Sequence, residues 1–204
     1  MNFKLFFVVI CVLVKGIQGH AAIMTSPIGI SIAYINDKDF AQFPVPNGSV
    51  YGVRIGALMA KNRDVYGLDI NGFVGYSNNS AGVQIAAYGN EIVNHARVFG
   101  LQLAGIRNKV GAAEIYGLQL AGVYNHILGE GEVYGAEVAI AGNYSPKTEV
   151  NGFQIGAFNR AKEVRGFQIG IVNVADKVHG VQIGLININH GGLLPVFPVI
   201  NMGF

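Results

Sequence analysis

A short alternating phrase recurs nine times between Tyr51 and Asn189. Each copy reads as a hydrophobic or aromatic residue, a glycine, an aliphatic, a polar residue, an aliphatic and a small residue, followed by turn residues. Side chains alternate between the two faces of a strand, so in one copy Phe167 and Ile169 share a face while Gln168 and its flanking glycines share the other. Self-similarity at this spacing predicts a repeat protein built of strands.

The two faces of the repeat differ in polarity. The first face is aliphatic and carries no charge at its centre in any copy. The second carries one polar residue per copy, flanked in most copies by Gly or Ala, and an aliphatic exterior around a polar interior is typical of outer-membrane barrels. We interpret these residues as a lumen-facing polar row: Arg54, Asp69, Gln84, Gln102, Gln119, Glu137, Gln154, Gln168 and Gln182.

The alternation predicts an all-β fold, an antiparallel up-and-down transmembrane β-barrel of about 10–12 short repeated strands. The alternative is a parallel β-solenoid, which stacks one motif in register and would turn the Gln and Asn positions into ladders. We favour the barrel because the spacing between copies drifts between 14 and 18 residues, whereas solenoid coils usually keep one length. The motif Gly-x-Gln-x-Gly also reads the same in both directions, so it suits an antiparallel neighbour equally well.

Aromatic residues begin or end the repeats on the aliphatic face. In an up-and-down barrel these rings would form two belts where the barrel meets the membrane–water interfaces, with membrane lipid as the partner. Their alternative role is that of ordinary strand formers. The predicted interface aromatics are Tyr51, Tyr66, Tyr76, Phe99, Tyr116, Tyr124, Tyr134 and Tyr144.

An asparagine follows the polar row at a nearly fixed offset in most copies. Asparagine tolerates turn conformations and bonds to its own backbone, so we expect these residues to form turns. They are Asn90, Asn108, Asn125, Asn143, Asn159, Asn173 and Asn187.

Composition points away from an ordinary soluble domain. Hydrophobic residues make up 51% of the chain and charged residues 13%, where roughly 25% charged is usual. The net charge is only +2 and the basic residues are scattered, so the field that holds nucleic acid is missing and we expect no nucleic-acid partner.

The chain begins with a pattern typical of a secretory signal peptide. Lys4 precedes an apolar run that ends at Val14 and is too short to span a bilayer as a helix. We expect residues 1–21 to be removed after Ala21, with cleavage after Gly19 as the competitor and a retained anchor as the alternative. The rest, residues 22–204, would form a single repeat-built β domain outside the cytoplasm. The only cysteine, Cys11, would leave with the signal.

No catalytic, metal or nucleotide motif stands out. No serine lies in a nucleophile elbow, and His95, His126, His179 and His190 lack the spacing of metal ligands. The glycine-rich segments lack the strand-to-helix context of a phosphate loop. We therefore expect no enzymatic activity, no metal and no cofactor.

The C-terminus alternates Ile200, Met202 and Phe204 and ends on the phenylalanine. This resembles the terminal strand by which barrel-assembly machinery recognises outer-membrane barrels, so we interpret Phe204 as an assembly signal. Pro195 and Pro198 weaken the match, since proline cannot donate to a ladder.

Residues 151–189 carry the pattern Gly-x-Gln-Ile-Gly-x-x-Asn, with weaker copies back to Tyr51, and residues 191–198 form the ending Gly-Gly-Leu-Leu-Pro-Val-Phe-Pro. In this the chain resembles the surface-repeat proteins of spirochaetes and other Gram-negative bacteria over about two-thirds of its length. The resemblance implies a location in the outer membrane or at the cell surface of a Gram-negative bacterium. It implies location more than activity.

Two functions fit these observations. The first is an outer-membrane barrel that serves as a small pore or as a structural, oligomeric membrane protein, in which the charged members of the polar row line a lumen or fill it with ion pairs. Close subunit contact would be allowed by Gly72, Gly105 and Gly122, which interrupt the aliphatic face. The alternative is a surface-displayed β-solenoid that acts as an adhesin or interaction scaffold.

Overall fold

A computed structural model describes residues 25–204 except residues 33, 36–37, 40–41 and 94–95. The predicted signal peptide, residues 1–21, lies outside the described residues. The described chain is all-β, and within it no helix has the length and apolar character needed to cross a membrane.

From β5 to β15 the strands alternate between a long strand that carries the repeated phrase and a shorter strand that follows it, whereas β16, β17 and β18 each continue from a short-strand part into a long-strand part. The first strands are β1 (Thr25–Ser31), β2 (Tyr34–Ile35), β3 (Lys38–Asp39), β4 (Gln42–Phe43), β5 (Ser49–Gly56), β6 (Met59–Lys61), β7 (Asp64–Asn71), β8 (Val74–Ser77), β9 (Asn79–Ala86) and β10 (Gly89–Ile92). The remainder are β11 (Ala96–Ala104), β12 (Arg107–Val110), β13 (Ala113–Ala121), β14 (Tyr124–Ile127), β15 (Gly131–Ala139), β16 (Gly142–Ile155), β17 (Phe158–Ile169), β18 (Val172–Asn189) and β19 (Val196–Gly203).

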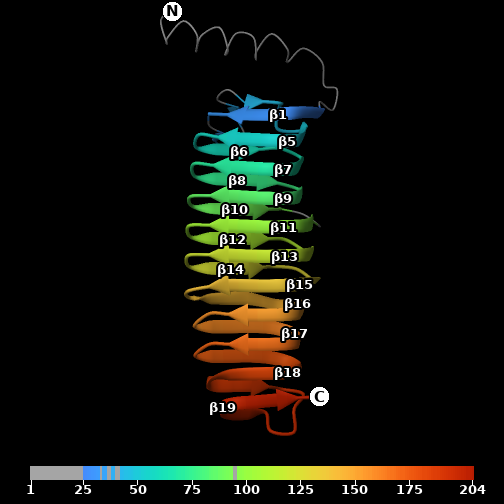
Figure 1. Cartoon of the computed structure of the whole chain (residues 1–204), viewed down its shortest axis with the longest axis vertical. Helices are drawn as coiled ribbons and strands as arrows, with labels where there is room; N and C mark the ends of the chain where they lie inside the picture. Colours follow the sequence, from blue (N-terminus) through green and yellow to red (C-terminus); the bar gives the residue numbers. More distant parts are fainter. Residues whose placement is uncertain (1–24, 33, 36–37, 40–41, 94–95) are drawn as a thin grey trace, which may run out of the picture.

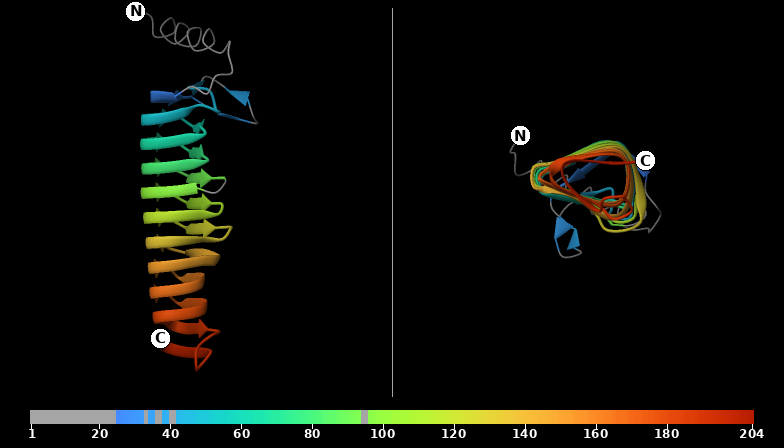
Figure 2. Two further views of the ribbon diagram at one scale, coloured as in Figure 1. Left: turned by 90° about the vertical axis from the view of Figure 1, so that its right-hand side faces the viewer. Right: turned by 90° about the horizontal axis from the view of Figure 1, so that it is seen from below.

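The repeats stack in parallel and in register. Gly100 of β11 is the partner of Gly117 of β13, and the same holds for Gln102 and Gln119 two residues later. The short strands pair in parallel in the same way, with Asn108 of β12 beside Asn125 of β14. Figure 1 shows the resulting column of coils, and the end-on view of Figure 2 shows the coils superimposed around one narrow outline. The molecule is a β-solenoid.

The predicted antiparallel barrel is therefore wrong, and the alternative holds. The alternation within each repeat correctly separates two faces, but it says nothing about the direction of the neighbouring strand, and the palindromic motif fits both directions. The drift in spacing does not disturb the stack because the additional residues lie mainly in the connection from the short strand to the next long strand. One such place is the irregularity in register between Ser145 and Glu149 of β16.

One glycine per repeat is required by the close approach of successive coils. The nine glycines of the repeated phrase have φ between 116° and 152°, a region that side chains with a Cβ rarely adopt. A Cβ added to Gly117 would also lie closer than 3.0 Å to the carbonyl oxygen of Gly100 in the preceding coil. The glycine ladder thus follows from the stacking itself.

An aliphatic column fills one part of the interior. Val98, Ile115, Val133 and Val150, one from each successive long strand, are almost completely buried. A second column from the short strands, which includes Val110 and Ile127, completes this hydrophobic core. Burial of such side chains supplies about 1.5–3 kcal/mol each.

The two ends of the column are closed differently. At the N-terminal end β1 pairs in parallel with β5 and in antiparallel fashion with β4. At the C-terminal end β19 lies antiparallel on β18. Within β19, Val199 has a φ of 69° and Pro198 lacks an N–H, features that interrupt an edge ladder.

Candidate functional site

The polar row lies in the core. All nine side chains are at most 2% exposed, and most are joined head to tail along the column. The Nε2 atom of Gln102 donates to Oε1 of Gln84 at 2.6 Å, and Nε2 of Gln119 donates to Oε1 of Gln102 at 2.5 Å. The same bonds link Gln182, Gln168 and Gln154. Because the solenoid encloses no barrel lumen, the row is a buried amide ladder and not the lining of a pore.

The asparagines that we predicted to form turns make a second buried ladder, so that prediction is wrong. Nδ2 of Asn108 donates to Oδ1 of Asn125 at 3.0 Å and also to the carbonyl oxygen of Leu120 at 2.9 Å. The sequence signal that indicates this ladder is the nearly fixed offset of each asparagine from the polar row. Each asparagine lies five or six positions after its polar-row residue, and at both offsets its side chain is inside the coil.

The two ladders run in opposite directions. Each glutamine donates to the coil before it, whereas each asparagine donates to the coil after it, as Asn143 does to Asn159 at 2.8 Å. Each amide-to-amide bond of the ladders satisfies one donor and one acceptor that would otherwise be buried without a partner, which costs about 1–3 kcal/mol.

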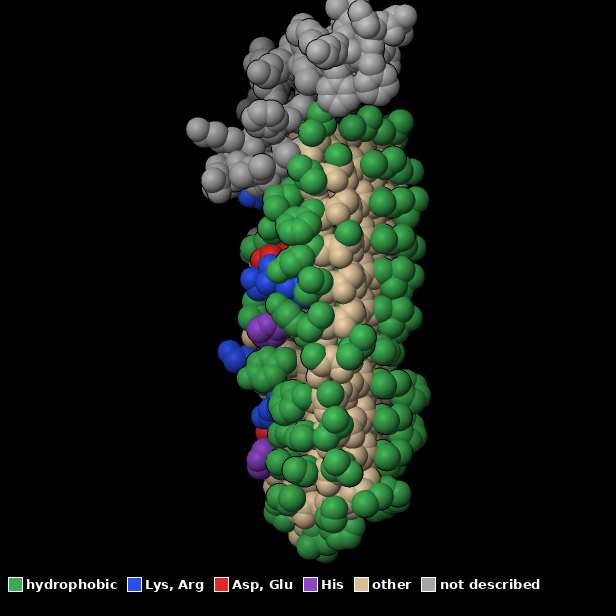
Figure 3. Space-filling view, turned by 90° about the vertical axis from the view of Figure 1, so that its left-hand side faces the viewer, with side chains coloured by type: hydrophobic (Ala, Val, Ile, Leu, Met, Phe, Trp, Pro, Cys, Tyr) green, Lys and Arg blue, Asp and Glu red, His purple; other side chains and the backbone are tan. Residues whose placement is uncertain are grey.

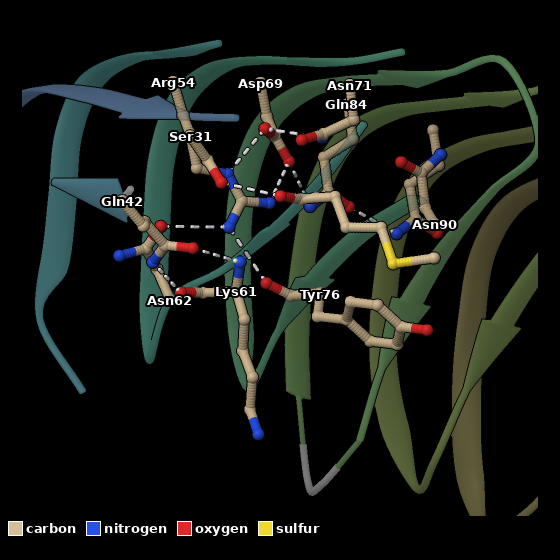
Figure 4. Close-up of polar contacts among 12 residues, drawn as sticks. Ser31, Gln42, Arg54, Lys61, Asn62, Asp69, Asn71, Tyr76, Gln84 and Asn90 are labelled. Atoms are coloured by element: carbon tan, nitrogen blue, oxygen red, sulfur yellow. Dashed lines mark hydrogen bonds and ion pairs between the residues drawn. The ribbon is translucent and has the colours of Figure 1, made fainter. Parts of the chain in front are cut away.

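An ion pair replaces the amides at the N-terminal end of the glutamine ladder. Arg54 donates from Nε and Nη2 to the two carboxylate oxygens of Asp69 at 2.7 and 2.6 Å. Both side chains are buried, and Asp69 also accepts hydrogen bonds from Asn71 and Gln84. Figure 4 shows this network, in which Arg54 further donates to the carbonyl oxygen of Tyr76. Both carboxylate oxygens of Asp69 and all three guanidinium nitrogens of Arg54 are hydrogen-bonded, as a buried structural pair requires.

Glu137 is the second acid of the row, and it has no cationic partner. Its carboxylate accepts from Oγ of Ser145 at 2.9 Å and from Nε2 of Gln154 at 2.6 Å. Burial raises the pKa of Glu137, an effect that these two hydrogen bonds oppose. On the other side lies Gln119, its partner in register, whose Oε1 atom is buried without a hydrogen-bond partner. A protonated Glu137 carries the donor that this oxygen lacks.

In the part of the chain that the structure describes, titratable side chains do not gather into a metal-binding group. Among the described residues, no cluster of three or more His, Cys, Asp or Glu side chains could hold a metal ion. His126 lies on a short strand beside Lys109, and burial followed by the charges of Lys109 and Arg107 lowers its pKa. His179 and His190 are exposed near single acids, Glu163 and Asp176 respectively. His95 lies outside the described residues.

Charged side chains lie in two places, along the short strands and at the starts of the long strands, where Arg97, Glu114 and Glu132 are successive partners in register. Along the short strands Glu91 bonds Lys109 at 2.9 Å and Arg107 at 3.3 Å. Arg160 bonds Asp176 at 2.7 Å between the first parts of β17 and β18.

The long strands present a mainly apolar outward surface, which we call the long-strand face. It consists of three parallel columns of outward side chains, and the charged column at the strand starts borders it. The middle column is Val53, Leu68, Val83, Leu101, Leu118, Ala136, Phe153, Phe167 and Val181, and the turn-side column is Ile55, Ile70, Ile85, Leu103, Leu120, Val138, Ile155, Ile169 and Ile183. The start-side column is Tyr51, Tyr66, Ala81, Phe99, Tyr116, Tyr134, Asn151, Arg165 and His179.

The side chains of this face remain open to solvent. Phe153 is 45% exposed and Ile55 is 53% exposed. Soluble monomers rarely expose contiguous apolar patches of more than a few hundred Å². The long-strand face is therefore the candidate binding surface of the molecule.

The predicted interface aromatics do not form two belts. Five of them lie in the start-side column, where Phe99, Tyr116 and Tyr134 stack with ring centroids 5.1 and 5.0 Å apart. Of the other three, Tyr76 and Tyr124 lie on the short strands β8 and β14, and Tyr144 lies in the first part of β16, which pairs with β14. The rings are thus divided between two sides of the coil by strand type.

An apolar groove runs along the edge next to the turn-side column. Its volume is about 910 Å³, and it is lined by side chains such as Leu103, Leu120 and Ile155 and by small residues such as Gly105 and Gly122. Figure 3 views this edge, with hydrophobic side chains along both margins of a strip of backbone. The groove extends the apolar surface around the corner of the coil.

Phe204 follows the last strand and is fully exposed. Its neighbouring strand β19 caps the solenoid and is no barrel strand. The recognition by barrel-assembly machinery that we expected for Phe204 required a closing barrel strand, which this fold does not supply.

Comparison with known proteins returns no match to the chain among family models, curated sequences or solved structures.

Proposed function

We propose that the protein is a surface-displayed β-solenoid that acts as an adhesin or interaction scaffold and not as an enzyme. The long-strand face is its binding surface. The predicted signal peptide and the resemblance to Gram-negative surface-repeat proteins support a location at the cell surface.

The single observation that carries this proposal is the long-strand face itself. Two of its columns contain no polar side chain over nine successive coils. Natural sheets usually place charged or polar residues on a solvent face, whereas the long strands of this chain confine outward charge to the strand starts, in the column of Arg97, Glu114 and Glu132 and in the last members of the start-side column. A surface of this kind binds apolar partners, of which membrane lipid and other copies of the chain are the two candidates.

The proposal is tested by placing charge on the face. Leu101→Lys with Leu118→Lys puts two ammonium groups on adjacent coils of the middle column, and Leu128→Lys is a matched control at an exposed turn outside the face. Self-association is measured by analytical ultracentrifugation, and lipid binding by flotation with vesicles of phosphatidylethanolamine and phosphatidylglycerol. Labelling of intact host cells reports surface display.

We expect the wild-type protein and the control to be labelled on intact cells and to associate with themselves or with vesicles. We expect the double variant to remain displayed and to lose that association at least tenfold. A wild-type protein that is monomeric and stays free of vesicles would overturn the role of the face. A protein that cannot be labelled on intact cells would overturn surface display.

A further inference from the structure

The middle column of the long-strand face contains a notch beside a ridge. Ala136 is the only small side chain in a column of Val, Leu and Phe, and its partner in register on the next coil is Phe153. Phe153 and Phe167 stack with their centroids 5.3 Å apart, and both are about 40% exposed, at 45% and 39%. A missing side chain and a protruding ring thus occupy adjacent coils.

The start-side column divides into two unlike halves. Its first six members are aromatic apart from one alanine, whereas its last three are Asn151, Arg165 and His179. The side chain of Arg165 is 56% exposed.

We propose that the partner of the long-strand face is a second copy of this chain, packed face to face and antiparallel. The two-fold axis lies along the strand direction, midway between the coils of Ala136 and Phe153. It places Phe153 of each copy in the notch at Ala136 of the other. The inference rests on the proposed function, since it names the partner of the same surface.

Like charges oppose the contact at one rim, where the charged column that precedes the start-side column sets Glu132 against Glu149 and Glu114 against Glu163. In the columns of the long-strand face the axis produces favourable contacts. It sets Phe167 against Leu118 in the middle column, and it sets Arg165 against Tyr116 in the start-side column. A guanidinium over a tyrosine ring is a favourable cation–π contact. In the turn-side column, aliphatic residues of one copy face aliphatic residues of the other copy. A C2 contact of this kind is isologous, so each favourable pair occurs twice.

The parallel arrangement of the two copies is less favourable. A two-fold axis along the solenoid would face the start-side column with the turn-side column, coil for coil. In the middle column Ala136 would then face Ala136 and Phe153 would face Phe153, so the notch would stay empty and the two ridges would oppose each other. The notch and the ridge thereby select the antiparallel pairing.

The area is sufficient for a stable dimer. Coils are spaced about 4.8 Å apart and alternate residues of a strand about 6.7 Å apart, so the overlapping coils measure roughly 40 by 20 Å. This is close to the roughly 800 Å² per partner that specific interfaces bury. The overlap includes β19, in which Ile200 and Met202 extend the face by one strand.

Exchange of the ridge residue Phe153 and the notch residue Ala136 tests the pairing. The full chain is studied by sedimentation equilibrium as wild type, as Ala136→Phe, as Phe153→Ala and as the double variant. Both positions are outward-facing, and circular dichroism verifies that each variant keeps the solenoid. Leu68→Ala is the control, because it truncates the same column at a coil outside the overlap.

We expect a wild-type dimer, a dissociation constant raised about tenfold or more by each single variant, and recovery to within about threefold in the double variant. The control should leave the constant unchanged. A double variant whose loss of dimer affinity equals the summed losses of the two single variants would overturn the antiparallel pairing. A wild-type monomer would overturn the dimer, and vesicle flotation of that monomer would still support the proposed function, so the two failures are distinguishable.

Discussion

At the scale of single residues, the interior of this protein is organised by which atoms can donate a hydrogen bond. An uninterrupted ladder needs a donor from every coil, and a carboxylate has none. Asp69 stands where the glutamine ladder begins and is neutralised by Arg54. Glu137 stands in the middle of the ladder, where only its protonated form can donate to Gln119. An acidic side chain therefore begins the ladder at Asp69, where Arg54 neutralises it, whereas the ionised carboxylate of Glu137 interrupts the ladder.

Replacement of this acid should stabilise the protein. Glu137→Gln supplies a permanent donor to Gln119 and still accepts from Gln154, so we expect a gain on the order of 1–3 kcal/mol in the free energy of unfolding at pH 7. Urea denaturation measures it. Glu149→Gln on the next coil is the control. Glu149 is partly exposed and lies 4.0 Å from Lys162, a long and therefore weak ion pair. Its replacement should change stability by less than about 0.5 kcal/mol.

The same substitution should remove a pH dependence. Burial raises the folded-state pKa of Glu137, so the native state holds a proton that the unfolded chain releases near pH 4.3 or above. The stabilisation is fully present below the unfolded pKa and is lost as the pH rises through the folded pKa. We expect wild-type stability to fall relative to Glu137→Gln over that window. Parallel curves for the two proteins would show that Glu137 does not titrate in this way.

At the scale of strands and coils, the position of a side chain within the coil matters more than the strand that supplies it. In β9 and β10 a small residue, Ala86, precedes the ladder residue Asn90. In β7 and β8 the order is exchanged, with Asn71 on the long strand and Gly75 on the short one. A Cβ added to Gly75 would meet the amide of Asn71, so one amide fills the same space from either strand.

The exchanged pair predicts a compensating double substitution. Asn71→Ala should cost about 1–3 kcal/mol because it removes a buried hydrogen bond to Asp69. Gly75→Asn should also destabilise, since two amides then compete for one space. Together they restore the usual order, and the new asparagine can donate to Oδ1 of Asn90, which is buried without a partner. Thermal unfolding of the four proteins should give a double variant at least as stable as Asn71→Ala.

The sequence was sufficient to identify the repeat, the strands and the inward side of each strand, because alternation and self-similarity are local properties. It did not determine how the copies pair. Gly-x-Gln-x-Gly is symmetric about Gln168, so only contacts between coils distinguish a parallel from an antiparallel neighbour. The asparagines were misassigned for a related reason: Asn125 has a turn-forming preference of its own, and only the parallel stack offers it a ladder.

At the scale of the whole molecule, stability is distributed along the column. Each coil contacts chiefly the coil before it and the coil after it, as expected of a solenoid, in which repeats add nearly independent increments. The ends are special because β1 and β19 close the stack with strands of a different kind. The length of the column is thus set by the number of repeats between two fixed caps.

Removal of one complete coil should leave a folded protein. Deletion of residues 166–179 joins Arg165 to Gly180 and preserves every column, because the copies at Gly166 and Gly180 are 14 residues apart. We expect a strand-rich circular dichroism spectrum, a lower melting temperature and a maximum dimension shorter by about 4.8 Å in X-ray scattering. Deletion of residues 166–172 removes half a coil and should unfold the C-terminal end; equal stability of the two deletions would contradict independent coils.

The opposed directions of the two amide ladders have an electrostatic consequence when the number of coils changes. Aligned amides add their dipoles head to tail, as the peptide units of a helix do, so a single ladder would build a potential between its ends that grows with every added coil. The glutamine and asparagine ladders point in opposite directions and their dipoles largely cancel. The column can gain or lose coils without accumulating a field along its axis, and its two caps need no compensating charge.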